Sequence, residues 1–209
     1  MIRVAPFGPP LMSNVKPPMD AIRVRQVHQR EYRDTTGFLE RLRDVEIAMS
    51  SRQVDPLVQR LRTRNLREWR EARLAALFCH GYGLRMGHKT YLSKGEFEDA
   101  DCVARWTVGD ETHFAPIQVK EVAPDDLNPR ANIGDVLKSL SRYSGVEDLT
   151  VLVHLNRREH FNLSEVEIPT GLKIASLWVL ACTEPNQSTW AIWGDLLDRP
   201  TRSDFAYPA

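Results

Sequence analysis

The sequence predicts an α/β protein with a mixed central sheet flanked by helices and with an N-terminal helical extension. A helical pattern precedes three short strand-like runs, which are joined by short turns and are therefore expected to be antiparallel. A helical segment then leads to a fourth, buried run, and such a crossover normally makes the strands that it joins parallel. With 209 residues, 42% of them hydrophobic, the chain is long enough for one sizeable core.

The N-terminal part is expected to be an arm followed by helices. Residues 1–19 hold five prolines and no periodic apolar pattern, which predicts an extended arm. Residues 20–64 form an arginine-rich helical region, in which one helix is expected from Asp20 to about Ser51. The apolar residues that predict this helix recur at spacings of three and four, at Phe38, Leu42, Val45 and Met49.

A second helical stretch begins at a recognisable signal. Asp55 precedes Pro56, which is the pattern of an acidic N-cap followed by proline at the first helical position. The apolar pattern continues to the Gly-Tyr-Gly of residues 81–83, where we expect the helix to end. Asn65 and Glu68 have the spacing of a further capping box, which leaves open whether this stretch forms one helix or two.

Residues 65–209 are expected to form the core of the protein, with additional strands at the C-terminal end. A linker that contains two prolines and a helix over residues 132–145 separate the third predicted strand from the fourth. The strands are predicted from short apolar runs bounded by turn residues, at 84–93, 101–108, 114–122 and 149–155, with a later pair at 173–183 and 188–197.

Composition and charge narrow the class of protein. No stretch reaches the length of a transmembrane span and the first twenty residues lack a continuous apolar segment, so we expect neither membrane insertion nor secretion, and a cytoplasmic location. The three cysteines include no C-x-x-C pair, which argues against a disulfide framework and against a zinc ribbon.

The net charge of zero conceals an asymmetry between the two halves of the chain. Residues 1–90 carry 17 Lys and Arg against 9 Asp and Glu, whereas residues 91–209 carry 11 against 19. The basic half is almost entirely arginine, which suits bidentate contacts to phosphate. The equally weighted alternative is a solvated helical surface that neutralises the acidic half of the same molecule.

Polar side chains on neighbouring predicted strands form the main candidate site. Residues two apart in a strand point the same way, so Gln118 and Lys120 share one face. A hairpin-like connection places Asp101, at the start of the preceding strand, beside this pair. A carboxylate and an amide carbonyl are oxygen ligands that suit Mg²⁺ or Mn²⁺, and an ammonium group can orient a water or stabilise charge on a phosphate.

Other residues complete or surround this candidate site. Glu71 lies three and seven residues before apolar positions of its helix, so it should face the sheet and supply a further carboxylate. Asp99 shares the strand parity of Asp101 just outside the strand and is the fallback metal ligand. Lys138 and Arg142 are four residues apart on the helix after the site, where they either hold a phosphate of nucleic acid or are simply solvated.

The succession of a helix with Glu71, a strand that begins at Asp101 and the "QVK" of residues 118–120, followed by a helix and a buried strand, resembles the PD-(D/E)XK nuclease superfamily. The resemblance covers roughly residues 65–155 and implies a restriction-endonuclease-like fold. It implies catalytic roles for Asp101, Gln118, Lys120 and Glu71, with the metal bound by Asp101, Gln118 and Glu71. The chain departs from the family pattern in two places: Ala100 stands where a proline is common, and Gln118 stands where an acid is expected.

The resemblance implies a metal-dependent DNA endonuclease of restriction, recombination, mobile-element or defence type, with Mg²⁺ or Mn²⁺ as cofactor and DNA as partner. A homodimer is compatible with the resemblance, because many such nucleases pair to cut both strands. Because a neutral amide at residue 118 should weaken metal binding, a catalytically inactive module that binds nucleic acid or protein is the open alternative. A toxin or effector nuclease that acts on RNA is a third possibility.

Overall fold

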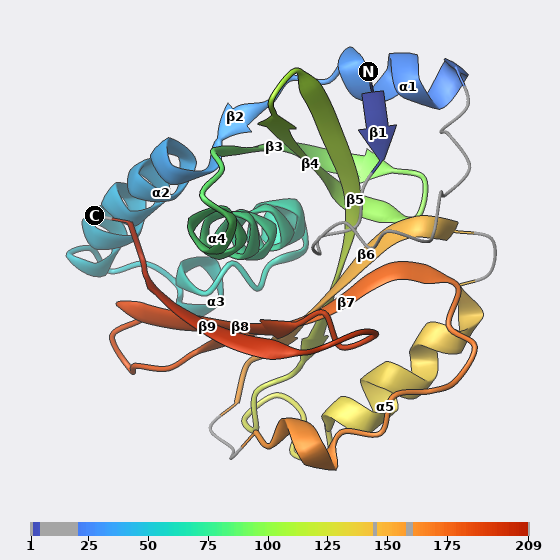
Figure 1. Ribbon diagram of the computed structural model, residues 1–209. Helices are drawn as coiled ribbons and strands as arrows, with labels where there is room; N and C mark the ends of the chain where they lie inside the picture. Colours follow the sequence, from blue (N-terminus) through green and yellow to red (C-terminus); the bar gives the residue numbers. More distant parts are fainter. Residues whose placement is uncertain (1, 5–20, 144–145, 158–160, 209) are drawn as a thin grey trace.

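The computed structural model describes residues 2–4, 21–143, 146–157 and 161–208. Figure 1 shows an α/β arrangement in which helices precede and flank one sheet. The helices are α1 (Ala21–His28), α2 (Thr35–Ser50), α3 (Pro56–Gln59), α4 (Arg67–Met86) and α5 (Ile133–Lys138). The strands are β1 (Ile2–Val4), β2 (Arg33–Asp34), β3 (Thr90–Phe97), β4 (Ala100–Val108), β5 (Glu111–Val122), β6 (Val146–Leu155), β7 (Ile174–Cys182), β8 (Thr189–Gly194) and β9 (Thr201–Ala206).

The sheet is mixed, as the sequence predicts, and it is open. Eight strands follow one another in chain order from β2 to β9, and β1 pairs with β5. The ladders β5–β6 and β6–β7 are parallel, whereas those from β2 to β5 and from β7 to β9 are antiparallel. The predicted helical crossover lies between β5 and β6 and consists of α5 with a 3₁₀ turn over Ser139–Arg142. None of the helices in the described part of the chain is both long and apolar enough to cross a membrane.

The first residues belong to the sheet, so the prediction of an arm without a folded element is wrong for Ile2–Val4. β1 runs parallel to β5 and pairs with its residues 112–114. β6 pairs with β5 only over residues 117–122, so β1 occupies the stretch of the β5 edge that β6 does not reach. The rest of the predicted arm, residues 5–20, lies outside the described residues.

The two faces of the sheet bury two separate cores. The sheet curves around α4, and α5 covers the outer face (Figure 1). Alternate residues of β7 show the division, because Trp178 packs with α4 whereas Leu177 packs with Leu137 of α5 and Leu140 of the 3₁₀ turn after it. A third, smaller cluster lies under α1, where Val27 packs against apolar residues of β3, β4 and β5.

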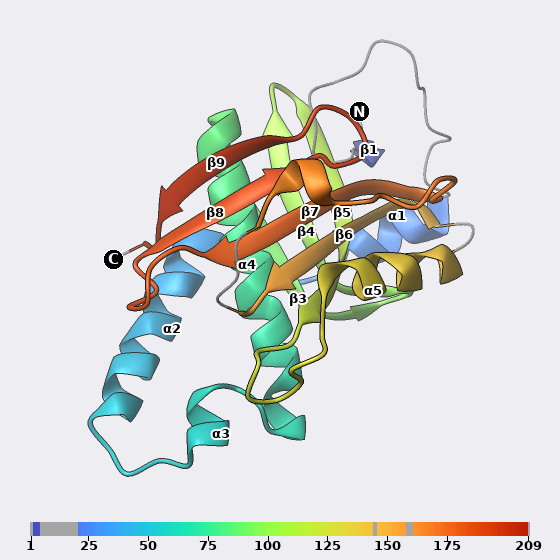
Figure 2. The same cartoon turned by 90° about the horizontal axis from the view of Figure 1, so that it is seen from below.

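The single helix predicted from Asp20 to Ser51 is two helices separated by β2. Val27 of α1 is buried against Phe114, whereas Phe38 of α2 belongs to the core around α4. One straight helix cannot reach both clusters, so the chain turns between them. The predicted apolar stripe also ends early, because Val45 is 51% exposed. Figure 2 shows α2 and α3 extending beyond the sheet.

The second helical stretch divides into α3 and α4. Asp55 caps α3 as predicted, accepting the backbone N–H of Leu57 at 2.7 Å, but α3 is a single turn. The capping box predicted at Asn65 and Glu68 is wrong. Leu66 is the N-cap of α4, and the Glu68 carboxylate accepts a hydrogen bond from Lys94 Nζ at 2.7 Å instead.

The glycines of residues 81–83 do not end the helix. α4 continues to Met86 and is terminated by Gly87, which adopts the left-handed conformation with φ of 70°. Gly81 serves close packing, because a Cβ atom at this position would lie 2.5 Å from the ring of Phe205 on β9. The continued helix also explains why β3 begins at Thr90 and not at the predicted residue 84. β9 itself was not predicted, since its exposed residues are mostly polar.

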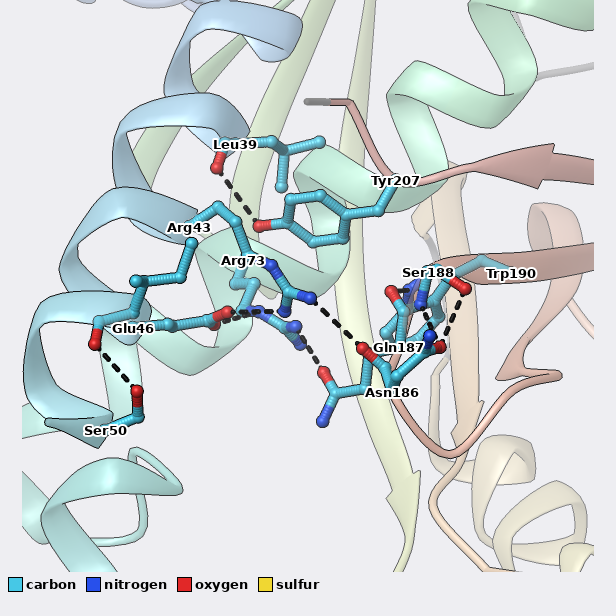
Figure 3. Close-up of polar contacts among 11 residues, drawn as sticks. Leu39, Arg43, Glu46, Ser50, Arg73, Asn186, Gln187, Ser188, Trp190 and Tyr207 are labelled. Carbon is cyan, nitrogen blue, oxygen red and sulfur yellow. Dashed lines mark hydrogen bonds and ion pairs between the residues drawn. The ribbon is translucent and has the colours of Figure 1, made fainter.

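A network around Arg73 of α4 joins α2, α4 and the C-terminal strands (Figure 3). Arg73 Nε pairs with Glu46 of α2 at 2.9 Å, and an amino group of Arg73 donates to Gln187 at 2.6 Å. The guanidinium lies 5.4 Å from the ring centroid of Trp190 and 5.7 Å from that of Tyr207. The Tyr207 hydroxyl donates to the backbone carbonyl of Leu39, and this hydrogen bond connects the segment after β9 to α2.

The contact between Gly81 and Phe205 gives a stability prediction. Gly81→Val should lower the free energy of unfolding by about 1–3 kcal/mol, because the added methyl groups collide with a packed ring. Leu84→Val is the matched control, since Leu84 lies on the same helix and is 61% exposed. Chemical denaturation of both variants measures the difference. If the free energy of unfolding fell equally in the two variants, close packing against Phe205 would not be the reason for the glycine.

Candidate active site

Asp101 lies where the antiparallel ladder between β4 and β5 ends. The last pair of that ladder is Cys102 with Ile117, so Asp101 and Gln118 are the next residues on each strand. The Asp101 Oδ2 atom accepts the backbone N–H of Val119 at 2.7 Å and a hydrogen bond from Gln118 Nε2. The carboxylate therefore replaces a backbone partner of β5, and only 7% of Asp101 is exposed.

Burial sets the protonation of Asp101. The pKa of this carboxyl group is raised to about 6, mainly because the group is removed from water and to a lesser extent because the carboxylate of Glu71 is nearby. The backbone hydrogen bond from Val119 and the positive charges of Lys120 and Arg67 act in the opposite direction but do not cancel the effect of burial. A buried carboxylate of this kind gains from any additional positive charge beside it.

Gln118 is 9% exposed and is held from both ends of its amide. Its Nε2 donates to Asp101, and its Oε1 accepts from the Tyr143 hydroxyl at 3.3 Å. The amide nitrogen therefore faces the carboxylate, as the hydrogen-bond network requires. To offer its oxygen to a cation bound at Asp101, the amide must rotate by half a turn. The hydroxyl of Tyr143 then becomes the acceptor for Nε2, which a hydroxyl can do.

Lys120 lies on the same strand face as Gln118, as predicted, and both side chains meet Tyr143. The Lys120 Nζ atom is 5.5 Å from the centroid of the Tyr143 ring, and the Arg142 guanidinium is 5.3 Å from it. Tyr143 also packs, partly buried, against the core that α5 covers. The crossover after β5 determines its position beside Gln118 and Lys120. The only signal in the sequence is the residue type, because the hydroxyl of a buried tyrosine usually has a hydrogen-bond partner.

Glu71 is near Asp101 but has a partner of its own. Its carboxylate pairs with Arg67 one turn earlier on α4 at 2.7 Å, and its side chain is 14% exposed. Burial is the main cause of the raised pKa of Asp101, and the negative charge of Glu71 adds to it. Among the described residues, no three His, Cys, Asp or Glu side chains are arranged to hold a metal ion. A cation at Asp101 would therefore depend on two carboxylates at most, the Gln118 oxygen and water.

Such a donor set fits Mg²⁺ or Mn²⁺. Mg²⁺ commonly keeps several waters and takes only one or two carboxylates from the protein. The buried carboxylate of Asp101 offers the negative charge, and the half-turn of the Gln118 amide offers a neutral oxygen. The thiol of Cys102 follows directly in the chain, but burial raises its pKa and keeps it protonated.

The remaining predicted residues lie around this cluster. Asp99, the fallback ligand, is exposed in the two-residue turn between β3 and β4. Lys138 ends α5 and Arg142 ends the 3₁₀ turn after it, and both are exposed. Arg142 donates a hydrogen bond to the Tyr143 hydroxyl, and this hydroxyl donates to Gln118, so Arg142 is connected to the cluster through Tyr143.

Several arginines of the basic half pair with acids of the acidic half. Arg62 makes two hydrogen bonds to Glu121, at 2.5 and 2.7 Å. Arg23 pairs with Glu98 and with Asp148. Intramolecular neutralisation, one of the two interpretations of the charge asymmetry, therefore accounts for a part of the basic charge.

No known protein family, characterised protein or solved structure matches this chain. The functional argument therefore depends on the geometry of its own residues.

The raised pKa of Asp101 makes stability depend on pH. The folded protein holds a proton at Asp101 up to about pH 6, whereas the unfolded chain releases it near pH 4, so stability falls as pH rises through this window. Asp101→Asn removes the charge but keeps one side-chain oxygen, which can accept both hydrogen bonds that Asp101 Oδ2 accepts. Relative to the native protein, the variant should gain about 2 kcal/mol of unfolding free energy between pH 4 and pH 7.

Chemical denaturation at several pH values measures this gain. Asp110→Asn, in the exposed turn between β4 and β5, is the matched control and should show no such trend. A difference between native protein and Asp101→Asn that stays constant from pH 4 to pH 7 would exclude burial of the charge as the controlling effect.

Proposed function

We propose that the protein is a metal-dependent nuclease of the PD-(D/E)XK type, with a restriction-endonuclease-like core, that hydrolyses phosphodiester bonds of DNA. The observation that carries the proposal is the cluster of Asp101, Gln118 and Lys120 where β4 and β5 separate. The order of elements supports it, because α4 precedes three antiparallel strands and α5 leads to the parallel strand β6.

Each residue has a chemical role in this proposal. Asp101, Glu71 and the Gln118 oxygen hold Mg²⁺ or Mn²⁺. A cation held there would supply a water of lowered pKa and would offset negative charge on the phosphate. Lys120 orients that water or stabilises the phosphate charge, and the Tyr143 ring limits where its ammonium group can lie. Asp99 remains the fallback ligand if the turn before β4 rearranges.

DNA is the proposed partner. Lys138 and Arg142 are exposed beside Tyr143 and can contact phosphates of a strand that reaches Lys120. A homodimer would place a second site on the opposite strand of a duplex. RNA is the alternative substrate, and cleavage assays with both nucleic acids distinguish the two.

A catalytically inactive module that binds nucleic acid or protein is the second candidate function. One observation favours it: the amide nitrogen of Gln118 satisfies the buried Asp101 carboxylate without a cation. A glutamate at the same position would instead face Asp101 with a second negative charge, so the glutamine stabilises the metal-free arrangement.

Cleavage of plasmid DNA in Mg²⁺ or Mn²⁺ tests the proposed activity. Asp101→Ala and Lys120→Ala should each lower the rate by about 100-fold or more, because the first removes a ligand of the cation and the second removes the positive charge beside the phosphate. Asp110→Ala and Lys173→Ala are the matched controls, since both residues are exposed and Asp110 lies in the turn at the other end of β4. Cleavage that survives both site substitutions would exclude this site.

Calorimetry with Mn²⁺ separates the active from the inactive interpretation. An active site should bind the ion, and Gln118→Glu should bind it about tenfold more tightly because a charged ligand replaces a neutral one. Asp101→Asn, which removes the charge, should abolish binding in either background. Absence of binding at millimolar Mn²⁺ in both the native protein and Gln118→Glu would favour the inactive module.

A further inference from the structure

A cavity of about 340 Å³ opens at the edge of the sheet beside β3, apart from the Asp101 cluster. Its walls come from the connection between α1 and β2, from α2, from α4 and from β3. This volume falls within the range of small-ligand sites, which starts at about 300 Å³. β2 pairs only with Tyr91 and Leu92, so the following residues of β3 have no strand on that side within the described chain.

The floor of this edge cavity is apolar and one wall is aromatic. Ala72 and Leu92 are buried beneath it, and Phe38 lines it from α2. The Phe38 ring is stacked on Trp69, with an angle of 7° between the ring planes and 6.3 Å between the centroids. The Lys94 ammonium lies 4.8 Å from the centroid of the Trp69 ring. Phe38 and the two floor residues form the apolar part of the cavity lining, which suits the face of an aromatic ring.

The rim of the cavity carries two cations on the same sheet face. Arg33 is directly opposite Leu92 in the β2–β3 ladder, and Lys94 lies two residues beyond Leu92. A third cation, Arg30, already donates hydrogen bonds within the protein, from its guanidinium to the backbone carbonyls of Lys94 and Gly95. Arg30 therefore holds the wall in place, and Arg33 and Lys94 remain the groups that can contact a ligand.

The acids that pair with these two cations are exposed. Arg33 contacts Glu31 at 3.2 Å, and the Glu31 side chain is 79% exposed. Lys94 contacts Glu68 at 2.7 Å, and the Glu68 side chain is 51% exposed. Exposed pairs of this kind contribute little to stability, so an anionic ligand with better geometry can displace the carboxylates.

We propose that this edge cavity binds a nucleotide. The base lies against Phe38 above the apolar floor, and the phosphate lies between Arg33 and Lys94. The combination of aromatic surface and cations is the one by which proteins hold unpaired nucleotides. The nucleotide is either a free monophosphate or one unit of a nucleic-acid strand, since both offer the same chemistry.

The cavity lies next to the candidate active site without sharing its residues. Lys94 is directly opposite Cys102 in the β3–β4 ladder, and Cys102 follows Asp101 in the chain. Nucleotide binding does not depend on hydrolysis, so the two proposals can fail separately.

Calorimetry on the full-length Asp101→Asn variant, without divalent metal, tests the cavity apart from the active site. Deoxyadenosine monophosphate should bind, whereas deoxyadenosine and inorganic phosphate should each bind more weakly because each fills half of the cavity. Arg33→Ala and Lys94→Ala should each lower the affinity for the monophosphate by about tenfold, because each removes one charge-assisted hydrogen bond. Arg52→Ala, at an exposed arginine between α2 and α3, is the matched control.

Two results would overturn the proposal. One is the absence of saturable binding at millimolar monophosphate, and the other is an affinity that Arg33→Ala and Lys94→Ala leave unchanged. A short single-stranded oligonucleotide distinguishes the source of the ligand. Tighter binding of the oligonucleotide than of the monophosphate, lost in the same two variants, assigns the cavity to a strand, whereas equal or weaker binding assigns it to a free nucleotide. DNA cleavage by the native protein is measured separately and can be absent while this binding is present.

Discussion

The packing of α4 inside the curve of the sheet is the constraint on which the other contacts depend. Small residues on its buried face, Ala72, Ala75 and Ala76, let the strands approach closely, and Gly81 leaves room for the ring of Phe205. Because α4 touches strands from both halves of the sheet, its position determines where each of them lies. The same packing brings Arg67 and Glu71, at its first turns, towards the start of β4.

The burial of Asp101 connects this architecture to chemistry. A carboxylate near the end of a ladder must replace the hydrogen bonds that it loses with water, and here it does so with the backbone of Val119 and the amide of Gln118. These hydrogen bonds do not fully offset the free-energy cost of burying the charge, and the pKa of Asp101 is therefore raised. A cation would offset that cost, and the amide of Gln118 offsets part of it without a cation. The balance between these two solutions decides whether a glutamine at this position is compatible with metal binding.

Arginine has a largely structural part in the contacts between the N-terminal helices and the sheet. Arg30 satisfies carbonyl oxygens where β3 departs from regular pairing, and Arg73 links α4 to α2 and to the C-terminal strands. Phe38 and Leu39 enter the same core as α4, so α2 is integrated with the sheet by apolar contacts as well. The edge cavity lies in this junction, where cations not needed for packing border an aromatic wall.

The sequence by itself determined the α/β class, the order of the elements from α4 to β8, the mixed sheet and the shared face of Gln118 and Lys120, because these follow from local periodicity and connection length. Only the tertiary structure decided the turn between α1 and α2, the continuation of α4 through Gly81 and the pairing of β9. It also decided that Tyr143 meets Gln118 and that Glu71 pairs with Arg67. These features depend on contacts between segments far apart in the chain, for which local patterns carry no signal.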